Sequence, residues 1–352
     1  MVAGRPTDDD GAYHDAMATS SVVVSAAGRD VQITSPEKVF FADRGDTKLD
    51  LVNYYIAIEA SLMQAMRDRP VLMQRFPNGA GGSSFFQKRV GDNVPDWLTT
   101  TIVSTPNGTT SRALVIADLA HFLWAVNLGC LGFHSWPVRT DDLEHPDELR
   151  IDLDPGPGTT FAMAQEAAGC VRALLTELGL RGFVKTTGSR GLHVYLRLQR
   201  RWDSVTVRAA AVAVARELER RHPTLITAAW WKEERGARIF VDFNQNAPHK
   251  TVFAPWSVRA RSMAPVSCPI RWDEVDAIRP DDLTIAVVPE RLRILGDPWA
   301  TIDDEPNSLE PLLELVARDQ ANGLVDAPWP PVYPEMEGEP PRVAPSRAKK
   351  PR

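Results

Sequence analysis

The sequence has little cysteine. Its three residues, Cys130, Cys170 and Cys268, are scattered along 352 positions. Their odd number and wide spacing exclude a disulfide framework and a zinc-ligand pattern, which suits a reducing compartment. The sequence also lacks any run of about 18 apolar residues, the length that a membrane helix needs. Its first fifteen residues hold no apolar stretch typical of a signal peptide. We therefore expect a cytoplasmic, nucleoid-associated protein without a membrane partner.

A surplus of positive charge is missing too. The formal net charge is −6, from 40 Lys and Arg against 46 Asp and Glu. The chain as a whole is therefore not built to attract nucleic acid, and any contact with DNA has to come from a local cluster of cations. The composition, with 43% hydrophobic and 24% charged residues, is ordinary for a globular protein. The length suffices for one large domain or two small ones.

The hydrophobic pattern predicts a single compact α/β domain over residues 22–333, a mixed sheet flanked by helices. Apolar residues recur at helical spacing in three segments: 49–66, where Asp46 and Thr47 are candidate caps, 160–180 and 204–221. Strand patterns occur at 22–24 or 31–34, and at 149–153, 182–187, 192–198 and 237–243. Some of these strands follow one another across short loops, so part of the sheet should be antiparallel.

Both ends of the chain depart from this pattern. Residues 1–21 are polar, acidic and small, which predicts a disordered arm. Residues 334–352 are rich in proline and end in several cations, which predicts a basic tail without regular structure. This tail is either a solvated linker or an additional grip on DNA, and charge runs are more often solvated.

Two aspartates at the end of one predicted strand are the sharpest functional feature. In the segment LRIDLDPGPG, Asp152 and Asp154 project from one face of the strand, while Ile151 and Leu153 face the core. Adjacent carboxylates repel each other unless a cation or a proton compensates them. Oxygen ligands without cysteine favour Mg²⁺ or Mn²⁺. The same pattern also occurs in solvated turns, so the pair alone leaves both interpretations open.

A third aspartate favours the metal site. Asp242 ends the predicted strand RIFVDF, as the first pair ends its own strand. Three carboxylates on neighbouring strands would hold two divalent ions, an arrangement that supports in-line phosphoryl transfer.

Groups suited to a triphosphate surround these acids in the sequence. The turn in KTTGSRGLHVY offers backbone N–H groups, and His193 lies on the strand that leaves it. We expect Arg259 and Arg261 to share one face of a strand over 256–261. An arginine guanidinium there can bind a phosphate through two parallel hydrogen bonds. Each feature has an ordinary alternative, since His193 could be a core histidine and the arginines a solvated strand face.

Three functions are compatible with these residues. A two-metal nucleotidyltransferase uses all three acids and the cations. A Mn²⁺-dependent glycosyltransferase also uses Asp-x-Asp to hold a nucleotide diphosphate, but it does not need the third acid. A non-catalytic module that binds DNA ends would use the cations alone, and a cluster of carboxylates would weaken its binding.

The chain resembles the polymerase domain of bacterial ligase D, a branch of the archaeo-eukaryotic primase superfamily, from about residue 28 to residue 332. The most specific segments are IDLDPGPG, TTGSRGLHVY and FVDFNQNAPHKTVFAPWSVRARSMAPVSCP, which occur in the family's order. The resemblance implies a primase-polymerase fold and a DNA-directed nucleotidyltransferase that favours ribonucleotides. No Lys-x-Asp-Gly ligase motif occurs in the sequence, so we expect a stand-alone relative of that domain.

Particular residues match the family's functional positions. The metal-binding aspartates would be Asp152, Asp154 and Asp242. The residues around the incoming nucleotide would be His134, Thr187, Arg190, His193, Arg235, Gln245, Lys250 and Arg259. The residues at the 5′-phosphate and the template would be Lys38, Lys48, Arg75, Phe85 and Phe86. Arg190 and Thr187 stand where the family often has lysine and serine, which keeps the charge and the hydroxyl.

The same resemblance implies cofactors and partners. Two ions of Mn²⁺, or of Mg²⁺, are expected at the site. The substrates would be nucleoside triphosphates and DNA with a gap or break that bears a 5′-phosphate, in gap filling or end repair. A Ku-like protein and a separate DNA ligase are the expected protein partners of a monomeric enzyme.

Overall fold

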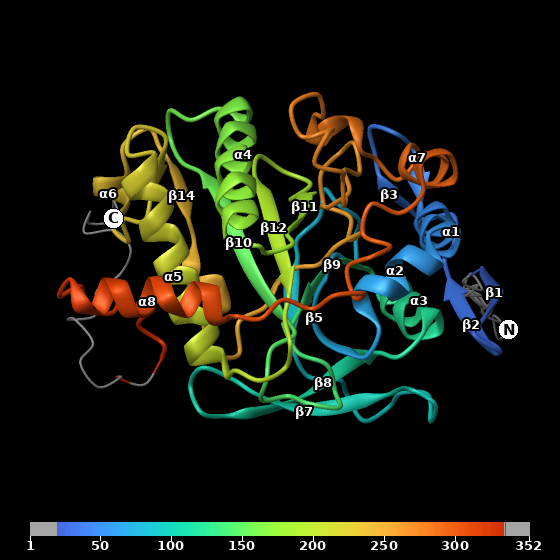
Figure 1. Ribbon diagram of the computed structural model, residues 1–352. Coiled ribbons are helices and arrows are strands. Elements are labelled where there is room, and N and C mark those ends of the chain that lie inside the picture. The colour runs from blue at the N-terminus through green and yellow to red at the C-terminus, as the bar shows by residue number, and fades with distance from the viewer. Residues whose placement is uncertain (1–19, 334, 336–352) are drawn as a thin grey trace, which may run out of the picture.

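The computed structural model describes residues 20–333 and residue 335. Of the predicted tail, only residue 335 is among the described residues. Of the predicted arm, only residues 20 and 21 are. The second of these, Ser21, already begins a strand. Two larger sheets lie next to each other in Figure 1, and one cluster of buried apolar side chains runs through both. The predicted mixed α/β class is confirmed.

The five-stranded sheet contains the segments that carry the predicted chemistry. Its strand order is β11-β12-β10-β14-β13, and only β13 and β14 run parallel. The register places Asp152 opposite His193, and Leu153 opposite Val241. The strands are β10 Glu148–Pro155, β11 Phe183–Thr186, β12 Leu192–Arg197, β13 Ile226–Thr227 and β14 Ile239–Val241.

The six-stranded sheet has the order β15-β9-β5-β8-β7, with β6 paired to β5. Strand β9 contacts the first sheet: the Arg150 guanidinium on β10 donates to the Ser135 carbonyl on β9 at 2.9 Å. The strands are β5 Arg69–Arg75, β6 Phe85–Gln87, β7 Thr100–Ser104, β8 Thr110–Ile116, β9 Cys130–Ser135 and β15 Val252–Phe253.

Helices cover one face of the five-stranded sheet. Helices α4 and α5 pack on β10, and α8 packs on α5 (Figure 1). Because side chains alternate along β10, residues that do not face these helices point to the other face. The helices are α1 Lys48–Ala57, α2 Glu59–Met66, α3 Leu119–Asn127, α4 Phe161–Glu177, α5 Ser204–Arg221, α6 Lys232–Arg235, α7 Val288–Leu295 and α8 Glu310–Ala321, with 3₁₀ turns η1 Phe243–Asn246 and η2 Pro280–Asp282.

The N-terminal part differs from the prediction in two details. Both alternative strands exist, since β1 (Ser21–Ala26) pairs with β2 (Arg29–Thr34) as a hairpin. The predicted helix over 49–66 is capped by Thr47 as expected, but it divides at Ile58 into α1 and α2. A second small pair joins β3 (Val39–Phe41) to β4 (Asp46–Thr47).

A buried ion cluster joins the two sheets. Arg69 on β5 donates to Asp147 at 2.7 Å, and its other nitrogen lies 2.7 Å from Glu148 on β10. Arg197 on β12 binds both of these acids, Arg150 on β10 binds Glu148, and all five residues are almost fully buried. Burial alone would raise the pKa of Asp147, but Arg69 and Arg197 hold it well below its usual range. The cluster therefore stays ionised and fixes β10 against β5.

Candidate active site

Three aspartates lie at the adjoining ends of β10 and β14. Asp152 and Asp154 belong to β10, and Asp242 follows the last residue of β14. The Asp242 N–H donates to the Asp152 carbonyl oxygen at 2.9 Å, which joins the two strand ends. Ile151 and Leu153 are buried, as their alternation with the acids predicts, whereas Asp154 is exposed.

These carboxyl groups occupy positions where ionisation is costly. Burial raises the pKa of Asp152 to about 6, against the opposing charges of Lys185 and Arg259. Burial and the charge of Asp152 raise the pKa of Asp242 to about 6, and the same two causes raise the pKa of Asp154. Buried carboxylates that repel one another are stabilised by a cation. The acids are therefore chemically suited to a divalent ion.

The side chains do not enclose such an ion as they stand. Among residues 20–333 and 335, no three His, Cys, Asp or Glu side chains are grouped closely enough to hold a metal. Asp154 is the most exposed of the three acids. The donor set itself, carboxylate oxygens without a thiolate, fits Mg²⁺ or Mn²⁺.

The predicted turn between β11 and β12 is confirmed, and glycine allows its close packing. Gly188 has a φ of +66°, and a Cβ atom there would lie 2.9 Å from the Arg259 side chain. A Cβ atom on Gly191 would lie 2.5 Å from the Leu153 carbonyl oxygen on β10. Thr187 Oγ1 accepts hydrogen bonds from two backbone N–H groups of the turn. The turn is therefore held tightly against β10, beside the aspartates.

A row of polar side chains crosses the sheet from Lys185 through His193 to Asp152. His193 Nε2 lies 3.2 Å from Asp152 Oδ1, while its buried Nδ1 has no hydrogen-bond partner among the described residues. Burial and the charges of Lys185 and Arg259 lower the pKa of His193 well below its usual value, so the imidazole is neutral. Because one ring nitrogen is buried without a partner, His193 does not behave as a satisfied core histidine.

His134 reaches this region from β9, a strand of the other sheet. Burial, followed by the charges of Arg259 and Lys185, lowers the pKa of His134 to about 3. Its Nε2 is buried and has no hydrogen-bond partner within the described part of the chain. A neutral imidazole with an open nitrogen is suited to bind a hydroxyl or a phosphate oxygen of a ligand.

Two arginines meet the turn from a distant part of the chain. Arg259 Nε donates to the Thr187 carbonyl at 2.8 Å, and Arg261 Nη2 donates to Ser189 Oγ at 2.7 Å. The predicted strand over 256–261 does not form; the segment is an irregular loop with one isolated bridge. The prediction that Arg259 and Arg261 share a strand face is thus wrong, although both arginines do contact the turn between β11 and β12.

Arg235 and Gln245 are held beside the acids by protein contacts. Arg235 donates to two carbonyls of its own loop, and its guanidinium lies 3.5 Å from the centre of the Phe240 ring. Gln245 Nε2 donates to Asp242 Oδ2 at 2.8 Å, so this amide orients a carboxylate. Gln245 therefore supports an acid directly, whereas Arg235 acts on Asp242 and Asp154 through its charge.

Arg190 and Lys250 have more open surroundings. Arg190 is exposed on the turn, and its charge acts on Asp154. Lys250 is half-buried, and its charge acts on Asp242. Cations thus lie on both sides of the carboxylates, which supplies the local positive cluster that the overall charge of −6 does not.

The two lysines predicted at a 5′-phosphate lie together near the N-terminal sheets. Lys38 Nζ donates to the Pro77 carbonyl at 2.6 Å. Lys48 is buried, and its Nζ donates to the carbonyls of Thr34 and Asn127 at 2.5 and 3.2 Å. Burial and the charge of Lys38 lower the pKa of Lys48. Two cations that repel each other favour an anion that binds near both of them.

The predicted aromatic pair lies between these lysines and the nucleotide residues. Phe85 and Phe86 are 47% and 57% exposed, so both rings are open to a ligand. The Arg75 guanidinium lies 5.2 Å from the Phe85 ring. Phe86 meets His134 edge-on, with ring centres 5.4 Å apart.

The contacts between aromatic rings extend from Phe86 through His134 and Phe253 toward the turn between β11 and β12. His134 meets Phe253 at 5.3 Å, and Arg259 lies 3.5 Å from the centre of the Phe253 ring. Our sequence reasoning missed Phe253, because nothing in its local pattern marks it. It also omitted Lys185 from the site, although pairing the two predicted strands across the short turn would have placed it opposite His193.

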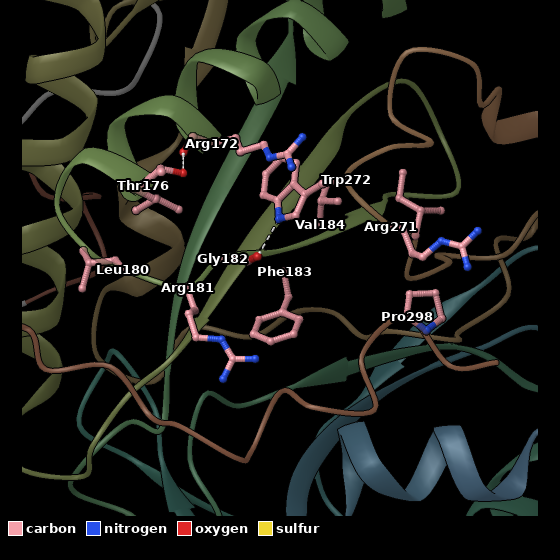
Figure 2. Close-up of a pocket in the computed structure, with 12 residues that line it drawn as sticks. Arg172, Thr176, Leu180, Arg181, Gly182, Phe183, Val184, Arg271, Trp272 and Pro298 are labelled. Carbon is pink, nitrogen blue, oxygen red and sulfur yellow. Dashed lines mark hydrogen bonds between the residues drawn. The ribbon is translucent and has the colours of Figure 1, made fainter. Parts of the chain in front are cut away.

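A separate pocket of about 350 Å³ lies at the outer edge of β11, beside α4 (Figure 2). Figure 2 shows the Trp272 indole N–H donating to the Gly182 carbonyl, with the Arg172 side chain above the indole ring. None of the predicted site residues lines this pocket.

Most of the chain that carries these residues matches a known family. The model of the LigD primase-polymerase domain matches residues 47–299. The chain belongs to this family. It is therefore a nucleotidyltransferase, and family membership implies a divalent metal. The alternatives of a glycosyltransferase and a non-catalytic module are thereby set aside.

Relatives of known name agree with this assignment. The multifunctional non-homologous end joining protein LigD of Mycolicibacterium smegmatis is 34% identical over 275 residues, 78% of this chain and 36% of that protein. The bifunctional LigD of Bacillus subtilis is 30% identical over 284 residues, 80% of this chain and 45% of that protein. The chain thus spans less than half the length of these curated relatives.

A solved structure shows the same fold. The polymerase domain from Mycobacterium tuberculosis ligase D, in complex with DNA, has a TM-score of 0.74 and 32% sequence identity. The match covers 79% of this chain and 99% of that one. The predicted primase-polymerase fold is confirmed. Within the described residues, no helix has the length and apolarity to cross a bilayer.

Proposed function

We propose that the protein extends a primer 3′-hydroxyl with nucleotides chosen by a template, at a gap or break in DNA. The observation that carries the proposal is the convergence of Asp152, Asp154 and Asp242 with the cationic turn at one end of the sheet. In the reaction, the hydroxyl oxygen bonds to the α-phosphorus, the bond to the β-phosphate oxygen breaks, and pyrophosphate leaves.

Each group has a role that follows from its chemistry. The three aspartates would hold two divalent ions, Mn²⁺ or Mg²⁺, which would activate the hydroxyl and stabilise the developing charge. Arg259, Lys250 and Arg190 bind the triphosphate by charge-assisted hydrogen bonds, and the two histidines steady the nucleotide. Arg235, Gln245 and Thr187 keep the acids and the turn in place.

The exposed aromatic pair and the two lysines suit a broken duplex. Lys38 and Lys48 bind the 5′-phosphate across the gap, beside Arg75, while Phe85 and Phe86 pack against template bases. Both named relatives above are end joining proteins, which supports a role in end repair. A Ku-like protein and a separate ligase are the partners that this role would need.

Primer extension on a gapped duplex tests this proposal. Ribo- and deoxyribonucleotides are supplied separately, each with Mg²⁺ and with Mn²⁺. We expect incorporation that matches the template, more efficient with Mn²⁺ and with ribonucleotides. The proposal would be contradicted if the protein binds the DNA but incorporates no nucleotide in all four combinations of nucleotide and metal.

The 5′-phosphate role of the lysines predicts a substrate-specific defect. Lys38→Ala and Lys48→Met should each lower extension on a gap with a downstream 5′-phosphate by about tenfold, since a charge-assisted hydrogen bond is lost. The measurement is kcat/KM on this DNA and on the same DNA with a 5′-hydroxyl. Equal losses on both substrates, or no loss on either, would refute the assignment.

A further inference from the structure

A strap formed by residues 324–333 leaves the end of α8 and packs on the turn that follows Asp242. Trp329 and Tyr333 are 2% and 6% exposed, and they form a small apolar cluster with Ala247. Their rings meet with centres 5.6 Å apart. The strap is therefore anchored next to η1, the 3₁₀ turn that contains Asn244 and Gln245.

Arg208 on α5 joins the strap to η1. This side chain is 1% exposed, and its Nε donates to Asn244 Oδ1 at 2.8 Å. Its Nη1 donates to Asp326 at 2.9 Å, and its Nη2 donates to the Ala327 carbonyl at 2.9 Å. The guanidinium also lies 3.8 Å from the centre of the Trp329 ring. One buried cation thus binds both segments, and each contact uses a different part of it.

Asn244 transmits this attachment to the acid. Its backbone N–H donates to Asp242 Oδ1 at 3.1 Å, while its side-chain amide donates to the Pro328 carbonyl of the strap at 3.1 Å. The other carboxylate oxygen accepts from Gln245 at 2.8 Å. Both oxygens of Asp242 are therefore oriented by η1, and η1 is fixed by the strap and Arg208.

We propose that the strap is a positioning element for the metal site, in which Arg208 and Trp329 orient the Asp242 carboxylate through Asn244. This inference rests on the proposed role of Asp242 as a metal ligand. Groups that orient a ligand set the affinity for the ion, because a carboxylate free to rotate loses entropy when it binds. Arg208 and Trp329 act through other residues, so they are positioning residues.

The test measures Mn²⁺ affinity directly. Free Mn²⁺ is followed by its electron paramagnetic resonance signal during titration of the purified full chain. Trp329→Ala and Arg208→Met are each expected to raise the dissociation constant roughly 10- to 100-fold. Saturating Mn²⁺ should restore most of the primer extension of both variants. Trp329→Phe retains a ring beneath the guanidinium and should shift the constant less than Trp329→Ala.

Two controls separate positioning from stability. Val325→Ser changes an exposed side chain of the strap (62% exposed) and should leave Mn²⁺ affinity unchanged. Phe122→Leu weakens the core at α3, so it should lower the melting temperature without changing affinity. If Trp329→Ala and Arg208→Met are folded and bind Mn²⁺ like the parent protein, the positioning role is wrong.

Asp242→Asn separates this inference from the proposed function. Unchanged Mn²⁺ binding by Asp242→Asn would remove the metal assignment itself. Weakened binding by Asp242→Asn together with parental binding by both strap variants would remove only the positioning role.

Discussion

Replacing Asp152 by asparagine is expected to lower nucleotide incorporation by about a thousandfold or more. The amide keeps the size of the side chain but removes the negative charge that a divalent ion needs. The measurement is single-turnover primer extension at saturating nucleotide, with Mn²⁺ varied over a wide range. Additional metal should not restore the rate, because the ligand itself is lost.

The same variant should be at least as stable as the parent protein without metal. The folded pKa of Asp152 is raised to about 6, above the ordinary value of an aspartate. Above pH 6 the folded protein therefore carries an ionised carboxylate at a cost of about 1 to 3 kcal/mol, and this cost fades as the pH falls toward 4. Asp152→Asn removes the cost, so thermal unfolding at pH 7 should occur at the same or a higher temperature. An inactive variant that is also unfolded would not support the metal role, and a folded variant with the parental rate would refute it.

Replacing Asp147 by alanine should cost about 3 to 5 kcal/mol of unfolding free energy. Asp147 binds Arg69 and Arg197, whose side chains are only 1% and 3% exposed. Without this acid, their charges remain buried with Glu148 and Asp303 as the remaining acids, and an attachment between the two sheets is lost. Urea unfolding followed by circular dichroism measures the loss.

Asp141→Ala is the matched control for this prediction. Asp141 also pairs with an arginine, Arg200, but its side chain is 66% exposed. Exposed ion pairs contribute little, so the control should lose less than about 1 kcal/mol. Equal losses of unfolding free energy in both variants would mean that burial is not the reason why the cluster stabilises the fold.

Many of the elements that carry the chemistry were predictable from local pattern. The helix over 204–221 has the predicted bounds, and the alternation of Asp152 with Ile151 and Leu153 gave their faces correctly. Such features depend on neighbours in sequence, where a period of 3.6 or 2 residues sets which side chains share a face. The turn at 187–191 was also predicted, since glycine and hydroxyl residues mark it.

Local pattern failed where distant segments decide the backbone. The segment 256–261 alternates like a strand, yet it forms a loop whose arginine contacts Thr187, 72 positions away. The helix predicted over 49–66 divides at Ile58, a residue whose side chain is buried in the core. In both cases packing against other elements outweighed the local preference.

The sequence by itself determined which acids, glycines and cations are the candidates, because their residue types and order favour phosphate and metal chemistry. Only the tertiary structure decided how they meet. It set Phe253 between His134 and Arg259, and it brought the strap of residues 324–333 against the turn after Asp242. These contacts join segments that are far apart in the chain, and long-range packing, which no local period encodes, is what brings them together.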